Sequence, residues 1–133
     1  MATKYGLLFF VFVLLQSCGA DKTSLLARTW KISELKYSRE VPEAMRASIQ
    51  TEIDRLKSGY TITYNADKTY QALMDGTATS GKWSLNFNSS KITSTGPDGK
   101  AVEYRILELS DARFSFEAIE GGEKVIFVMV PAQ

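Results

Sequence analysis

The sequence predicts a mainly β protein: an eight-stranded antiparallel up-and-down barrel with one helix inserted after the first strand. Apolar residues recur at every second position in six short segments, and turn-forming residues separate most of them. Residues 91–95 are a further short strand, and residues 123–130 are apolar on both faces. One segment, residues 42–59, instead repeats its apolar residues at helical spacing. The chain has 133 residues, of which 44% are hydrophobic and 23% charged, which suits a single globular domain.

The first predicted strand covers residues 29–38. Its apolar alternation starts at Trp30 and changes phase near Glu34, which indicates a β-bulge. The helix that follows has Pro42 at its first position, where proline is favoured, and Gly59 at its end. Its apolar stripe is expected to pack against the barrel and consists of Met45, Ile49, Ile53 and Leu56.

Seven further strands follow the helix. Asn65 begins a turn, the pair Asp75 and Gly76 begins a flexible connection, and the pair Gly121 and Gly122 forms a hairpin turn. A meander of this length must hide its edge strands, and closure into a barrel does so. The alternative is an α+β arrangement with the helix on one face of a curved antiparallel sheet. The predicted strands are residues 60–65, 69–75, 81–87, 91–95, 101–109, 113–119 and 123–130.

The composition excludes several classes of function. The chain has no histidine and one cysteine, so it cannot build a Ser-His-Asp triad, a Cys-His dyad or a zinc site of imidazoles and thiolates. The net charge is +1 and no cluster of basic residues occurs, which argues against nucleic-acid binding. Catalysis by carboxylates, Lys, Tyr or Ser alone stays open from the composition, but we expect a protein that is not an enzyme and that has no catalytic residues, no metal and no cofactor.

Residues 1–17 are typical of a signal peptide. Lys4 precedes an apolar run, residues 6–15, that is too short to span a bilayer. The segment "LLQSC" then resembles the lipobox of bacterial lipoproteins, through Leu15, Ser17 and the only cysteine, Cys18. The alternatives are a secreted protein with a spare thiol and an uncleaved anchor.

The lipobox resemblance implies a diacylglyceryl group on the Cys18 sulfur, cleavage after Ser17, and acylation of the new amino terminus, for example with palmitate. Several acyl chains hold a protein stably on a membrane, whereas one does so only marginally. Residues 18–24 would then tether a domain of residues 25–133 to a membrane of the bacterial cell envelope. We expect the outer membrane; the leaflet is left open.

Four segments of the predicted barrel, "LLARTWKI", "ITYNADKTYQ", "GKWSLNF" and "VEYRILELSDARFSF", together resemble bacterial lipocalin-like domain lipoproteins. The resemblance covers about residues 25–130 and implies a small lipocalin-like barrel. Lipocalins usually have Gly two residues before the first-strand Trp, where this chain has Arg28. The substitution implies a diverged relative with its own packing at the closed end of the barrel.

An eight-stranded barrel is just wide enough to be filled by side chains or to hold one small ligand. Aromatic residues on the inward face therefore either form a solid core or line a pocket. We expect Tyr64, Tyr70, Trp83 and Tyr104 to bind a ligand, with Arg105 holding a carboxylate head group if its side chain points inward. The aromatic residues expected to point inward are Trp30, Tyr60, Tyr64, Tyr70, Trp83, Phe87, Tyr104, Phe114, Phe116 and Phe127.

Two functions remain open. In the first, a membrane-anchored barrel carries or senses a small apolar or amphiphilic molecule. In the second, a solid barrel is an accessory or inhibitory module that binds an envelope protein. A continuous apolar cavity of a few hundred Å³ would favour the first function, because ligand pockets have that size.

Overall fold

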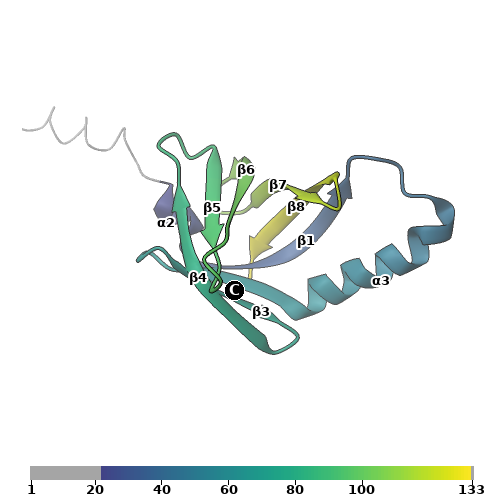
Figure 1. The fold of residues 1–133 in the computed structure, drawn as a ribbon, viewed down its shortest axis with the longest axis horizontal. Helices are drawn as coiled ribbons and strands as arrows, with labels where there is room; N and C mark the ends of the chain where they lie inside the picture. Colours follow the sequence, from purple (N-terminus) through teal and green to yellow (C-terminus); the bar gives the residue numbers. More distant parts are fainter. Residues whose placement is uncertain (1–21, 133) are drawn as a thin grey trace, which may run out of the picture.

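The computed structural model describes residues 22–132, which form a closed barrel of eight strands (Figure 1). Each strand pairs antiparallel with the next along the chain, and the last pairs with the first. This confirms the predicted fold and excludes the α+β alternative. The strands are β1 (Thr29–Tyr37), β2 (Tyr60–Tyr64), β3 (Thr69–Met74), β4 (Thr77–Leu85), β5 (Lys91–Thr95), β6 (Ala101–Leu109), β7 (Phe114–Glu120) and β8 (Glu123–Pro131).

The bulge predicted in the first strand is present, because the register of β1 against β8 shifts between Ile32 and Glu34. The predicted flexible connection at Asp75 and Gly76 is wrong. Both residues have positive φ, 51° and 84°, and they join directly paired Met74 and Thr77. Such a pair forms the tight hairpin turn that matches strand twist, so β4 begins at Thr77 rather than at residue 81.

The helix α3 (Glu43–Gly59) lies outside the barrel, on the side away from the short helix α2 (Thr23–Leu26) (Figure 1). Its carboxyl-terminal end is attached to the β3–β4 turn by an ion pair of 2.7 Å between Arg55 and Asp75. Only part of the predicted packing face is covered: Leu56 packs against the core, whereas Met45 is 51% exposed and no residue of α3 is fully buried.

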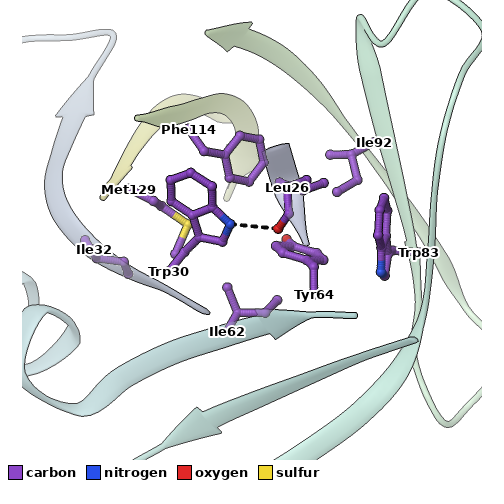
Figure 2. Packing of buried hydrophobic residues seen from close by; sticks show 9 residues of the cluster. All are labelled: Leu26, Trp30, Ile32, Ile62, Tyr64, Trp83, Ile92, Phe114 and Met129. Atoms are coloured by element: carbon purple, nitrogen blue, oxygen red, sulfur yellow. Dashed lines mark hydrogen bonds between the residues drawn. The ribbon is translucent and has the colours of Figure 1, made fainter. Parts of the chain in front are cut away.

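One end of the barrel is closed by a solid core (Figure 2). Leu26 of α2 and Trp30 of β1 are both fully buried there. The Trp30 indole N–H donates a 3.0 Å hydrogen bond to the Leu26 carbonyl, so α2 is fixed as a plug. Phe114 packs on Trp30 with 5.7 Å between ring centroids. The Arg28 guanidinium lies outside this core, 5.5 Å from the centroid of the Trp30 ring.

Phe87 was expected to point inward, but its side chain is 100% exposed. β4 ends at Leu85, and the side-chain oxygen of Asn86 accepts hydrogen bonds from the backbone N–H groups of Ser90 and Lys91. This local turn removes Phe87 from the strand alternation. The expectation failed because a turn residue stands directly before the aromatic one.

Candidate functional site

The half of the barrel away from α2 is hollow. A cavity of about 270 Å³ lies there, close to the lower limit of ordinary ligand pockets. Leu56 of α3 is the only lining residue that does not come from a strand. The lining residues are Ile32, Leu56, Tyr60, Ile62, Tyr64, Tyr70, Ser94, Tyr104, Phe116, Ala118, Glu120, Phe127 and Met129.

Three of the five residues predicted to bind a ligand line this cavity: Tyr64, Tyr70 and Tyr104. Tyr60 joins them, at the start of β2, where Ile62 separates it from Tyr64 on the inward face. Among residues 22–132, none of these four phenol groups has a hydrogen-bond partner in the protein. No fully enclosed polar side-chain atom is left unpaired in this part of the chain, so the hydroxyls open onto cavity space.

Burial raises the pKa of three of these phenols. It raises the pKa of Tyr60 to about 12, with smaller contributions from Tyr104 and Tyr70. Burial also raises the pKa of Tyr64 well above its ordinary value, and that of Tyr104 to a lesser degree, with the nearby Glu120 carboxylate adding to the second shift. The hydroxyls of Tyr60, Tyr64 and Tyr104 are therefore neutral at physiological pH and can each donate one hydrogen bond and accept others.

A cluster of packed aromatic rings also lines the cavity. The rings of Phe116 and Phe127 are stacked, with centroids 5.1 Å apart and 8° between their planes. Tyr104 contacts Phe116 at the same centroid distance but is tilted by 48°. The cavity thus combines flat apolar surface with several polar groups whose positions the strands hold, which is the usual composition of a small-molecule site.

Trp83 was also predicted to bind a ligand, but it does not line the cavity. It is buried in the solid end of the barrel, where its ring packs edge-on against Tyr64 at 5.5 Å. Its indole N–H donates to the carbonyls of Asn65 and Thr69, and the Lys68 ammonium lies 4.5 Å from its ring centroid. Trp83 therefore fastens the β2–β3 turn, and this gives the "NADKT" and "GKW" segments a structural role.

Arg105 was predicted to hold a carboxylate only if it pointed inward. It stands opposite Lys91 of β5 and Glu117 of β7, while its neighbours Tyr104 and Ile106 pack inward. Because side chains alternate along a strand, Arg105 lies on the outer face, where it is exposed and does not line the cavity. The structure places no basic residue among those that line the cavity.

The sequence reasoning did not select Tyr60, Ser94 or Glu120, which also line the cavity. Tyr60 was recognised as inward but not as a ligand residue. Ser94 has the phase of buried Ile92. Glu120 has the phase of Phe116 and Ala118, but the predicted strand stopped at residue 119. Extending the alternation by one residue would have found it.

Other kinds of site are not indicated within residues 22–132. No group of three His, Cys, Asp or Glu residues there could hold a metal ion. No helix in the same range combines the length and apolarity that crossing a bilayer requires. Cys18 and the predicted signal peptide lie outside the described residues, and Thr23 and Ser24, expected at the end of the tether, belong to α2.

Comparisons with known proteins agree with this barrel. Solved structures with similar folds include a lipocalin-like protein from Bacteroides uniformis (TM-score 0.53, 14% identity, 80% of this chain and 98% of that one). A DUF4847 family protein from Bacteroides vulgatus is also similar (TM-score 0.54, 16% identity, 80% of this chain and 93% of that one). Likenesses at this identity show the fold alone. No curated protein matches the sequence. The model of the lipocalin-like domain family matches residues 26–116, and the chain belongs to that family.

Proposed function

We propose that this protein is a lipid-anchored lipoprotein of the bacterial cell envelope whose barrel binds a small apolar or amphiphilic molecule. The observation that carries the binding function is the 270 Å³ cavity, into which four phenol hydroxyls open without a partner in the described protein. Because these hydroxyls are accessible from the cavity, they can hydrogen-bond to a molecule that occupies it. A ligand with polar atoms would satisfy these hydroxyls while its apolar part contacts Phe116 and Phe127.

The cavity favours this function over the solid-barrel alternative, in which the protein is an accessory or inhibitory module for an envelope protein. That alternative requires a filled interior, and only the α2 half of the barrel is filled. We also propose that the protein is not an enzyme. The polar lining groups are four phenols, one serine and one carboxylate, and within residues 22–132 the Ser94 side chain has no hydrogen bond to a base that would activate it as a nucleophile.

The lipid anchor would hold the barrel in a defined orientation. The predicted tether enters the described structure at Lys22, immediately before α2, whose Leu26 plugs the solid end. The cavity lies in the opposite half of the barrel. An anchor on Cys18 would therefore place the solid end nearest the membrane and turn the cavity toward the surrounding aqueous space.

Cavity-filling variants test the binding function. Ser94→Phe adds a ring on the inward face of β5, whereas Thr93→Phe adds the same ring on the outward face next to it. We expect the wild type and Thr93→Phe to bind 2-naphthol, a small neutral fluorophore, and Ser94→Phe to bind it at least tenfold more weakly. Circular dichroism checks that both variants fold. Equal binding by both variants, or no binding by the wild type, would refute a ligand in the cavity.

The anchor has a separate test. Cys18→Ala should leave the chain unacylated, so that its intact mass no longer includes the acyl groups and its partitioning between detergent and water changes. Gln16→Ala is a matched control, because position 16 is the tolerant position of the lipobox. If Cys18→Ala has the mass and partitioning expected of an acylated chain, Cys18 is not the attachment site.

A further inference from the structure

Among the residues that line the cavity, only one is charged. Glu120 is the only Asp, Glu, Lys or Arg among the lining residues, and it lies at the rim, where the cavity meets the outer surface of β6 and β7. Its charge is felt at the Tyr104 hydroxyl, whose pKa it helps to raise. Inside the cavity an anionic ligand would therefore meet a like charge and no counter-ion, because Lys91 and Arg105 line only the adjoining outer surface, whereas a cationic ligand would meet an acceptor.

The position of the Glu120 carboxylate on its strand does not stabilise the fold. Across the β7–β8 hairpin it stands directly opposite Glu123. Like charges in that position destabilise a hairpin. Glu123 is neutralised by Arg39 at 2.9 Å, but Glu120 has no ion-pair partner among residues 22–132. The unpaired carboxylate is thus free to bind a cation from outside the chain.

The size of the cavity limits the ligand. One water molecule takes about 30 Å³ of the liquid. On that scale 270 Å³ holds a molecule of about ten non-hydrogen atoms, and a long acyl chain would fill the space with much of its length still outside. The stacked pair Phe116 and Phe127 offers a flat surface that suits a ring.

Building on the proposed ligand-binding function, we infer that the cavity takes a small aromatic amine, with its ring among Phe116, Phe127 and the tyrosines and its ammonium group at the rim beside Glu120. Glu120 and the face of the Tyr104 ring, both at the rim, would bind the cation. Fatty acids and other carboxylates are excluded by charge, and long-chain lipids by volume.

Three probes of similar size and different charge test the inference: 2-phenylethylamine, 2-phenylethanol and phenylacetate. Isothermal titration is carried out on the full chain in nanodiscs of zwitterionic lipid. We expect the amine to bind about fivefold more tightly than the alcohol, as for one solvent-accessible charge pair, and phenylacetate to bind most weakly. Raising salt from about 10 mM to 1 M shortens the screening length from about 30 to 3 Å and should reduce the preference for the amine.

Glu120→Gln removes the charge and keeps the shape of the side chain. It should lower the affinity for the amine about fivefold and leave that for the alcohol unchanged. Glu117→Gln is the matched control, because Glu117 lies on the same strand but on the outer face, paired with Lys124. It should leave both affinities unchanged.

Several results would overturn the inference. They are equal or tighter binding of the alcohol or of phenylacetate, an unchanged amine affinity in Glu120→Gln, an equal loss in Glu117→Gln, and no binding of any of the three probes. In each case the binding of 2-naphthol to Ser94→Phe and Thr93→Phe tests the proposed binding function independently of the ligand class. A cavity that binds 2-naphthol but does not prefer the amine refutes the ligand class and retains the binding function.

Discussion

The buried phenols predict that the barrel loses stability at alkaline pH, and that Tyr60 is responsible for a measurable part of the loss. Burial first, and then the neighbouring Tyr104 and Tyr70, raise the pKa of Tyr60 from 10.0 to about 12. Below pH 10 this phenol is protonated in the folded and the unfolded chain, so its contribution to stability is constant. Between pH 10 and 12 it ionises only in the unfolded chain, so unfolding becomes more favourable.

The size of the effect follows from the shift. One pKa unit corresponds to about 1.4 kcal/mol, so Tyr60 costs the folded state about 1 kcal/mol at pH 11 and about 3 kcal/mol well above pH 12. Tyr60→Phe removes this cost. At pH 8 the substitution should change the free energy of unfolding by less than about 0.5 kcal/mol, because the hydroxyl has no partner among the described residues.

Urea denaturation at pH 8, 10 and 11 measures this difference. We expect wild type and Tyr60→Phe to unfold at the same midpoint at pH 8, and the variant to be more stable by about 1 kcal/mol at pH 11. Absorbance of the phenolate at 295 nm gives the number of tyrosines that ionise in the folded protein. The reasoning is refuted if both proteins lose the same free energy between pH 8 and 11, or if Tyr60→Phe already destabilises the fold strongly at pH 8.

Three further substitutions test the fold that supports the cavity. Leu26→Ala should lower the free energy of unfolding by about 2–5 kcal/mol in urea denaturation, because Leu26 is fully buried in the plug; a loss below 1 kcal/mol would mean that α2 is not part of the core. Gly81→Ala should cost about 1–3 kcal/mol in thermal or urea unfolding, because its methyl group would overlap the Thr95 carbonyl and the Tyr70 ring; a neutral effect would contradict this close packing. Gly76→Ala should lower the free energy of unfolding, measured in urea, by about 1 kcal/mol, because φ is +84° there and no atom lies near the added methyl group. A larger loss would point to a contact that the structure lacks.

The strand order could be predicted from the sequence because local signals and barrel closure agree. Alternation marks most of the strands, a run that is apolar on both faces marks the last, and turn residues between them leave few ways to connect the chain. The predictions of strand ends and turns are wrong where one or two residues determine the local backbone. Asp75 and Gly76 adopt positive φ and close a hairpin in two residues, and Asn86 ends β4 before Phe87. In both cases a side chain or a backbone angle overrides the alternation.

The candidate site could be predicted only in part, because alternation gives the direction of a side chain but not its depth in the barrel. Tyr64, Trp83 and Tyr104 all point inward. Trp83 lies in the solid end, Tyr104 lies at the rim of the cavity, and Tyr64 touches both regions. Depth depends on the register between strands and on the stagger of the barrel, which are set by pairing over long sequence distances. Arg105 differs, because the inward residues beside it already indicated that it points outward.

The two halves of the barrel divide stability from binding. The solid half contains a hydrogen-bonded tryptophan, a fixed helix and a turn fastened by Trp83, so most of the fully buried side chains lie there. The hollow half lacks such packing and is spanned by the same continuous strands, which hold Tyr64 and Phe116 in place from the solid side. A cavity lined by unpaired phenols lowers stability in comparison with a filled core. The barrel nevertheless retains this cavity, at the end opposite the predicted tether. The retained cavity is the strongest structural reason to expect a ligand there.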